Sequence, residues 1–150
     1  MHEVGEIFTN RVLLCALTAW FVAQAMKIPT YYLVEHRLNW RRFLDSGGMP
    51  SSHTALMVSL TIIIGSMMGF GTPLFALSFC ITTIVMYDAT GVRRETGKQG
   101  QVLNEIIRKV FINGEPISDE NLKELVGHTH LEVAGGVVIG VMTALAYIFF

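Results

Sequence analysis

The chain has 150 residues, of which 51% are hydrophobic and only 15% are charged, and its formal net charge is −1. Soluble domains carry about 25% charged residues, so this shortage, with a mean hydropathy of +0.48, excludes an ordinary soluble domain and indicates an integral membrane protein. The near-neutral charge gives no basis for nucleic-acid binding. The length predicts a single membrane-embedded domain over residues 1–150.

The hydrophobic pattern predicts an all-α bundle of about four transmembrane helices, because each span needs roughly 20 apolar residues. The first segment has neither the basic start nor the cleavage site of a signal peptide, so we expect it to be retained as a span. In chain order, the predicted spans cover Ile7–Ile28, His53–Phe70, Pro73–Tyr87 and Leu131–Phe150.

Two polar regions, Lys27–Ser52 and Asp88–His130, connect these spans. In the second, apolar residues recur at helical spacing over "QGQVLNEIIRKVFING", which predicts an amphipathic helix before the last span. A shorter helix is expected over Asp119–Val126. Ten of the eleven lysines and arginines lie in the two regions. We expect a multi-pass protein of the plasma membrane. With four spans both polar regions fall on one face, and the positive-inside rule predicts that this face is cytoplasmic and that both termini lie outside.

The loop "GGMPSSH" stands at the start of the second predicted span. Ser51 or Ser52 can cap that helix, and the N–H groups and dipole of its first turn attract anions. His53 follows in the same turn, where it could touch a bound anion. A simpler interpretation is a capped helix with a histidine at the membrane interface, and the loop taken alone favours it.

The stretch "GHTHLEVAGGVVIG" begins the last predicted span. His128 and Glu132 are four residues apart, so in a helical turn the carboxylate would orient the imidazole and raise its basicity for nucleophilic attack. His130 is the weaker candidate, because it would point about 160° away from Glu132. A simple interfacial ion pair is the alternative. Three glycines predict close helix packing in lipid: Gly135, Gly136 and Gly140.

Basic residues also stand at the ends of the first and third predicted spans. Arg93 and Arg94 follow the third span in "MYDATGVRRETGKQG", and a planar guanidinium suits phosphate. Asp88 could orient one of them, whereas the other is expected to serve as a membrane anchor. Lys27 either snorkels to the headgroups or reaches the site as a point charge.

These features together are the groups that phosphoryl transfer through a phosphohistidine requires. Two histidines, a carboxylate, strong cations and a helix N-terminus would meet at one membrane face. One histidine would attack phosphorus while the other protonates the leaving oxygen, and the cations and N–H groups would stabilise the charged phosphorus. We therefore expect neither a metal nor another cofactor.

Three stretches, "GGMPSSHTA", "YDATGVRR" and "GHTHLEVAGGVVIG", together with Lys27, resemble the divergent branch of the type-2 phosphatidic acid phosphatase and vanadium haloperoxidase superfamily. The resemblance implies that His128 is the nucleophile, with Glu132, in place of the usual Asp, as its orienting partner. It implies His53 as the general acid. The residues predicted to bind phosphate are Lys27, Ser51, Ser52, Arg93 and Arg94.

The chain departs from the superfamily pattern at several positions. No Arg-Pro follows Lys27 at the usual spacing, and Arg41 and Arg42 are the arginines nearest to the "PSSH" loop. Residues 121 and 122, where the third-motif arginine should stand, are Asn and Leu, so Arg93 or Arg94 would replace it. Ser52 stands where "PSGH" has glycine. Membrane members have six spans, whereas four are predicted here.

The sequence thus predicts a metal-independent lipid phosphatase that acts on a lipid phosphate or diphosphate, of the phosphatidate, phosphatidylglycerophosphate or polyprenyl phosphate type. The alternative is a non-catalytic membrane protein that binds or transports a phosphorylated lipid or anion, which the missing arginine spacing favours. A zinc site ranks last, because no H-E-x-x-H sequence is present; its ligands would be His53, His128, His130 and Glu132. Expected partners are the phosphorylated lipid, the bilayer and, through the glycine-rich last helix, a second copy of the chain.

Overall fold

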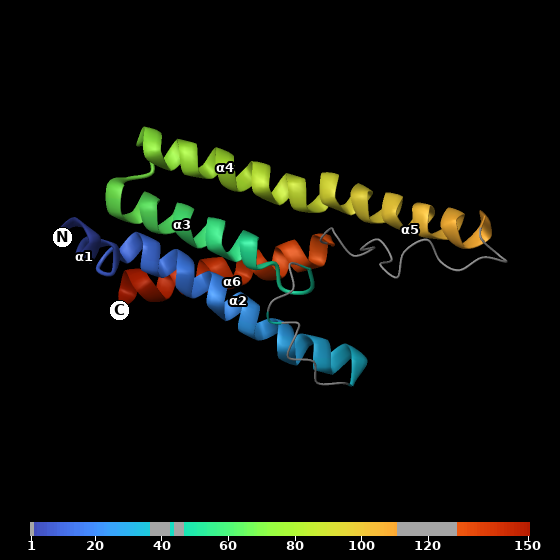
Figure 1. The fold of residues 1–150 in the computed structure, drawn as a ribbon. Coiled ribbons are helices and arrows are strands. Elements are labelled where there is room, and N and C mark those ends of the chain that lie inside the picture. Colours follow the sequence, from blue (N-terminus) through green and yellow to red (C-terminus); the bar gives the residue numbers. More distant parts are fainter. Residues whose placement is uncertain (1, 37–42, 44–46, 111–128) are drawn as a thin grey trace.

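The structure, a computed structural model, describes residues 2–36, 43, 47–110 and 129–150, without the side chains of residues 2–4, 34, 92–94, 98, 105 and 107–110. Six α-helices account for most of these residues, which confirms the predicted all-α fold (Figure 1). In chain order they are α1 (His2–Ile7), α2 (Arg11–Glu35), α3 (Ser52–Met68), α4 (Pro73–Thr90), α5 (Val92–Val110) and α6 (His130–Phe149).

The predicted start of the first span was wrong. The helix is interrupted between α1 and α2, and α2 begins at Arg11 rather than near Ile7. Asn10 causes the restart, because its side-chain oxygen accepts hydrogen bonds from the N–H groups of Val12 and Leu13 at 3.0 and 3.1 Å, as an N-cap does. At its other end α2 continues past Ile28 to Glu35.

The other predicted spans agree with the structure to within a few residues. The second corresponds to α3, which ends at Met68 because Gly69 takes a positive φ of 98°. The third, predicted to end at Tyr87, continues as α4 to Thr90. The last corresponds to α6.

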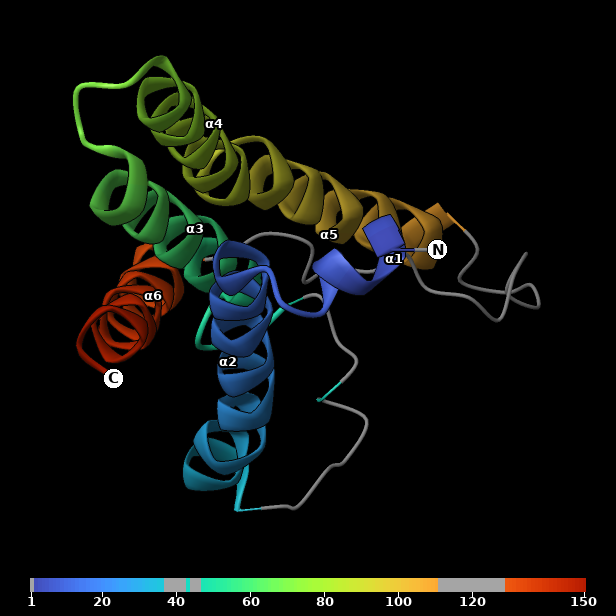
Figure 2. The same cartoon turned by 90° about the vertical axis from the view of Figure 1, so that its left-hand side faces the viewer.

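Helix α3 lies at the centre of the bundle. It packs against α2, α4 and α6, and α2 also packs against α6 (Figures 1 and 2). Consecutive helices of the bundle run in opposite directions, so the C-terminal ends of α2 and α4 and the N-terminal ends of α3 and α6 meet at one end. We call this end of the bundle the site end.

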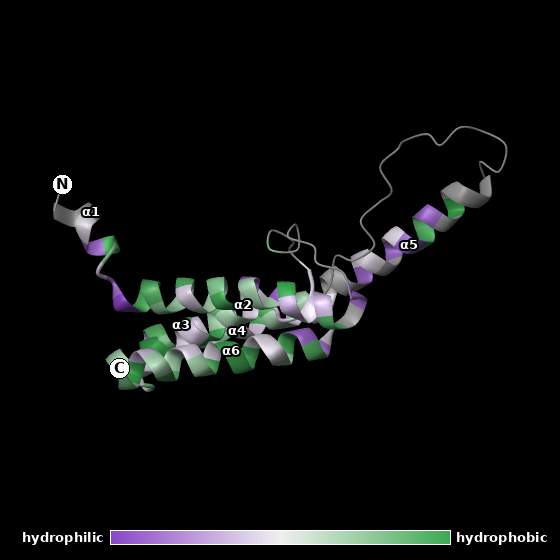
Figure 3. Cartoon of the chain, turned by 90° about the horizontal axis from the view of Figure 1, so that it is seen from below, coloured by the Kyte–Doolittle hydropathy of each residue, from purple (hydrophilic) through white to green (hydrophobic). Residues whose placement is uncertain are grey.

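Three helical runs are long and apolar enough to cross a membrane: Arg11–Leu33, Pro73–Asn104 and His130–Phe149. Helix α3 is apolar but shorter, with 17 residues, which correspond to about 25 Å at 1.5 Å per residue. A bilayer core is about 30 Å thick. Because α3 packs against the other three helices of the bundle, its short length is compatible with a place inside a membrane bundle. Figure 3 shows the apolar character of the bundle and the more polar character of α5.

Small residues allow the helices of the bundle to approach one another closely. The core contains two clusters, one around Cys15, Ile63 and Ala144, and another formed by Ala19, Ala23 and Ala55. Many large apolar side chains lie on the outside instead, as expected where lipid takes the place of water. Polar contacts also join the helices: the hydroxyls of Thr61 on α3 and Thr82 on α4 are 2.8 Å apart and buried.

The predicted amphipathic helix is present as α5, although it begins earlier than expected. The hydrogen-bond ladder continues from α4 into α5, because Gly91 N–H donates to Tyr87 O at 2.8 Å and Glu95 N–H donates to Gly91 O at 3.0 Å. Its apolar residues Val102, Leu103 and Ile106 are exposed. The predicted helix over Asp119–Val126 lies outside the described residues.

Candidate phosphate site at the end of the bundle

The last residues of the loop before α3 are held by hydrogen bonds to two other helices. Gly48 takes a φ of 93°, a conformation that favours glycine. The hydroxyl of Thr30 on α2 donates to the carbonyl oxygen of Met49 at 2.6 Å. The backbone N–H of Ser51 donates to the carbonyl oxygen of Glu132 on α6 at 2.9 Å. The loop therefore bridges α2 and α6 as it enters α3.

Ser51, rather than Ser52, is the N-cap of α3. Its hydroxyl oxygen accepts hydrogen bonds from the N–H of Thr54 at 3.4 Å and from the hydroxyl of Thr54 at 3.0 Å. Both serines are buried. Because the N–H of Ser51 is already bonded to Glu132, any hydrogen bond from Ser51 to a phosphate would have to come from its hydroxyl proton. Phosphate binding by Ser51 and Ser52 stays a prediction.

The glycines of α6 let this helix touch the loop and α3 directly. A Cβ atom on Gly136 would overlap the carbonyl oxygen of Ser51 and would lie 2.8 Å from Cβ of Thr54. On Gly140 it would lie 2.8 Å from the carbonyl oxygen of Ala55. Both distances are too short for real Cβ contacts. The predicted close packing at Gly136 and Gly140 is confirmed, and it brings the "PSSH" and "HLEVAGG" stretches together.

Glu132 closes the first turn of its own helix. Its carboxylate accepts the backbone N–H of Thr129 at 2.8 Å, and the hydroxyl of Thr129 accepts the N–H of Glu132 at 3.3 Å. This reciprocal pair is a capping box. Helix α6 consequently begins at His130, and its N-cap Thr129 is extended. Our expectation of a helical turn from position 128 to position 132 is therefore not met at Thr129. His128 itself lies outside the described residues, and its pairing with Glu132 stays a prediction.

Lys27 is almost completely buried, with 3% of its surface exposed, in the C-terminal half of α2. This burial excludes the expectation that its ammonium group simply snorkels into the headgroups. One turn earlier, Gln24 is also buried, and its side-chain nitrogen donates to the carbonyl oxygen of Phe43 at 2.7 Å. Sequence reasoning missed Gln24, although a polar residue within a predicted span was a usable signal.

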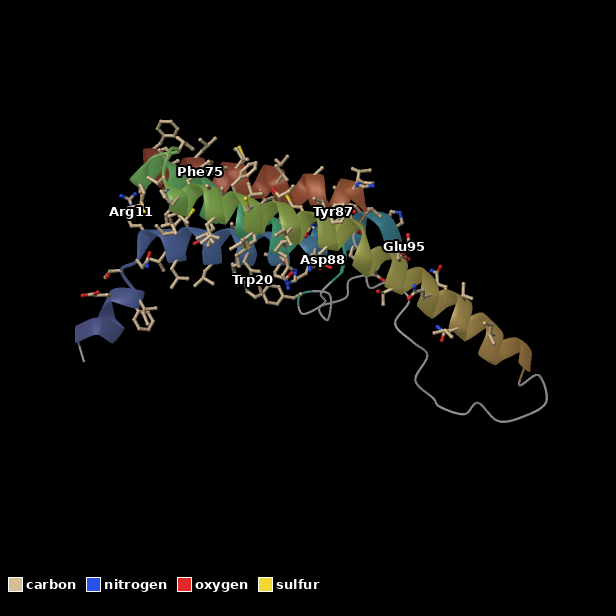
Figure 4. The ribbon with its side chains drawn as sticks, turned by 90° about the horizontal axis from the view of Figure 1, so that it is seen from above. Arg11, Trp20, Phe75, Tyr87, Asp88 and Glu95 are labelled. Carbon is tan, nitrogen blue, oxygen red and sulfur yellow. The ribbon has the colours of Figure 1, made fainter. Side chains whose placement is uncertain are left out.

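His53 is the second residue of α3 and its side chain is exposed. Asp88 is half-buried near the end of α4. Figure 4 shows Tyr87 and Asp88 next to the start of α5, at the opposite end of the bundle from Arg11 and Phe75. The backbone at positions 93 and 94 belongs to the first turn of α5, whereas the two arginine side chains lie outside what is described.

The structure therefore gathers several of the predicted residues at the site end. Lys27, the two serines, His53 and Glu132 come from α2, α3 and α6, whose ends meet there. The positive end of the α3 dipole and the buried Lys27 lie among these residues. Within the described part of the chain, no group of three His, Cys, Asp or Glu side chains could hold a metal ion, and the predicted zinc ligand His128 is not in that part.

Comparison with known proteins identifies the family of the chain. A family model described as "Divergent PAP2 family" matches residues 8–143. The "Uncharacterized membrane protein YuiD" of Bacillus subtilis (strain 168) is 36% identical over 155 residues, which cover 97% of this chain and 98% of that protein. No solved structure matches the chain. The chain is an integral membrane protein and belongs to the Divergent PAP2 family.

Proposed function

We propose that this protein is a metal-independent lipid phosphatase that releases phosphate from a membrane lipid through a phosphohistidine. Membership of the Divergent PAP2 family supports a phosphatase-related role. The observation that carries the proposal is the hydrogen bond from Ser51 N–H to Glu132 O at 2.9 Å. It holds together two stretches that are far apart in sequence and that a phosphohistidine mechanism would need side by side.

The proposed reaction has two steps. In the first, an imidazole nitrogen of His128 attacks phosphorus, the bond from phosphorus to the lipid oxygen breaks, and His53 gives that oxygen a proton. In the second, water attacks the phosphohistidine, gives a proton to His53, and phosphate leaves. Lys27, with Arg93 or Arg94, would stabilise the negative charge on phosphorus. The lipid tail would supply binding energy away from the reacting atoms.

The burial of Lys27 adds physical support. A buried charge is costly unless an opposite charge or hydrogen bonds compensate it. In a membrane bundle such residues most often mark a substrate or ion pathway. A phosphate that enters next to Lys27 would meet a positive charge in a place of low dielectric, where the attraction between opposite charges is strong.

The test is phosphate release by the purified full-length chain in lipid nanodiscs that contain a chelator. The substrates would be phosphatidate, phosphatidylglycerophosphate and a polyprenyl phosphate. We expect turnover of at least one of them, and loss of at least about 100-fold in His128→Ala. His130→Ala, two residues away, is the matched control and should retain activity. Turnover that survives in His128→Ala would reject the mechanism.

A non-catalytic role is the second candidate, and one contact favours it. The carboxylate of Glu132 already accepts the N–H of Thr129 at 2.8 Å, which occupies part of its capacity to orient a histidine. A protein that only binds or moves a phosphorylated lipid would use the same cations and helix N-terminus. It would bind lipid phosphates without releasing phosphate, and acid-quenched samples would contain no phosphohistidine.

A further inference from the structure

Gln24 has one side-chain atom that the fold leaves without a partner. The residue lies on α2 with 5% of its surface exposed. Its side-chain nitrogen donates to the carbonyl oxygen of Phe43 at 2.7 Å. Its side-chain oxygen Oε1 is buried and has no hydrogen-bond partner in the described structure. Gln24 is the one residue with such a buried, unpartnered side-chain atom in the part of the chain that the structure describes.

The orientation of this amide is fixed by its neighbour. Turning the amide over would place its oxygen against the carbonyl oxygen of Phe43, and two acceptors repel each other. The edge-to-face contact between the rings of Phe21 and Phe43, with centroids 5.8 Å apart, also holds Phe43 against α2. Because an unsatisfied buried acceptor loses its hydration without compensation, and bilayer interiors offer no water, a donor is expected at Oε1.

The position of Gln24 indicates which donor is suitable. It lies three residues before Lys27, so the two share one flank of α2. Along the axis Gln24 is about 4.5 Å further from the site end. A lipid whose phosphate sits beside Lys27 has its tails directed into the membrane. The atoms that connect the phosphate to the tails therefore pass at the level of Gln24.

We propose that Gln24 is a substrate-binding residue whose Oε1 accepts a hydrogen bond from a hydroxyl group located between the phosphate and the tails of the lipid. This inference rests on the proposed function, since it assumes that the phosphate binds beside Lys27. It names the substrate class as a lipid phosphate with a hydroxylated headgroup, such as a glycerol unit. A site that hydrogen-bonds a substrate hydroxyl discriminates against the analogue that lacks it, because the buried partner is then left unpaired.

The experiment measures binding rather than turnover, so it is independent of catalysis. The ligands are two non-hydrolysable phosphonate analogues of phosphatidylglycerophosphate, one with the glycerol hydroxyl and one with propanediol in place of glycerol. Each is titrated into the full-length chain in nanodiscs. Three proteins are compared: wild type, Gln24→Met, and Thr30→Val as a control, because Thr30→Val also removes a side-chain bond to the same loop.

We expect wild type and Thr30→Val to bind the hydroxylated analogue about tenfold more tightly. In Gln24→Met the two affinities should become equal. A purely structural role of Gln24 would weaken both ligands alike and keep their ratio. Equal affinities in wild type, or a ratio that persists in Gln24→Met, would overturn the inference while leaving the proposed function intact.

Two further outcomes would also overturn the inference, one by identifying a different donor and one by the absence of binding. If the affinity of both analogues falls in wild type as the phosphonate loses its second proton, and Gln24→Met removes that dependence, the donor is the acidic hydroxyl of the phosphate, and the headgroup assignment is overturned. If neither analogue binds to any of the three proteins, this inference fails, and the proposed function then depends on phosphate release from phosphatidate or a polyprenyl phosphate.

Discussion

The backbone N–H of Ser51 donates to the carbonyl oxygen of Glu132 at 2.9 Å, although most of the chain separates the two residues. The contact depends on Gly136, one turn further along α6, where a Cβ atom would overlap the carbonyl oxygen of Ser51. The N-cap of α3 and the first turn of α6 are thus held as one unit. Any ligand at the site end meets both helix N-termini in a fixed arrangement.

Replacement of Gly136 tests this unit. Gly136→Ala should lower the free energy of unfolding by about 1–3 kcal/mol, because overpacked cores must shift their backbone. Gly135→Ala is the matched control, since its nearest neighbour, Cβ of Pro50, would be 3.3 Å away. Both changes raise helix propensity equally, so the difference between them isolates the contact. Unfolding in mixed detergent micelles measures it, and equal stabilities would contradict the prediction.

The contact between α3 and α4 provides a second test. Thr82 donates its hydroxyl proton to the carbonyl oxygen of Met57 at 3.1 Å, so Thr61 must be the donor in the 2.8 Å contact between the two hydroxyls. Thr82→Val should therefore cost more stability than Thr61→Val, because it removes two hydrogen bonds instead of one. In a double-mutant cycle the coupling should be about 0.6 kcal/mol. A coupling of zero would mean that the hydroxyls do not interact.

Much of the fold was predictable because lipid-facing helices are apolar over a whole span. The predicted spans correspond to α2, α3, α4 and α6, and the glycines of α6 were correctly assigned to close packing. The break before α2 was missed because Ile7 and Phe8 extend the apolar pattern across it. The signal was Asn10, a favourable N-cap residue, which hydropathy does not detect.

The site was predictable in its residue types but less so in its geometry. The sequence "THLE" has the pattern of a capping box, and it could have indicated that α6 begins at His130 rather than before it. By contrast, the unpartnered oxygen of Gln24 depends on where the carbonyl of Phe43 lies. Phe43 lies in the connection between α2 and α3, and a connection has no periodic sequence pattern from which its position could be predicted.

Lys27 is expected to carry much of the affinity for phosphate. Lys27→Met should weaken the binding of a lipid phosphate at least about tenfold, because it removes a buried positive charge from a place of low dielectric. Lys27→Arg should retain part of the affinity. Arg11→Met is the control at the opposite end of the bundle, where Arg11 bonds to the carbonyl oxygen of Tyr147 at 2.7 Å. Titration in nanodiscs measures all of these affinities, and undiminished binding by Lys27→Met would exclude Lys27 from the site.

The orientation in the membrane is tested by labelling single cysteines. Met49 is exposed in the loop at the site end, and Phe8 is exposed at the other end. In a Cys80→Ser background, which leaves only the buried Cys15, a membrane-impermeant maleimide should label Phe8→Cys in intact cells. Met49→Cys should react only after permeabilisation, because the positive-inside rule predicts a cytoplasmic site end. The reverse pattern would show that the site faces outward.

Glu132→Gln separates the structural and the catalytic roles of this carboxylate. Glutamine at this position can still accept the N–H of Thr129 and complete the capping box, so we expect the unfolding temperature to change little. The negative charge that would stabilise a protonated His128 is lost, and phosphate release should fall about 100-fold.

Thr129→Ala is the complementary control. It removes the cap and about 1 kcal/mol of stability but keeps the carboxylate, so activity should survive wherever the protein remains folded. Turnover and thermal unfolding are measured on the same nanodisc samples. Full activity in Glu132→Gln would leave the carboxylate with its capping role alone and would remove it from the proposed mechanism.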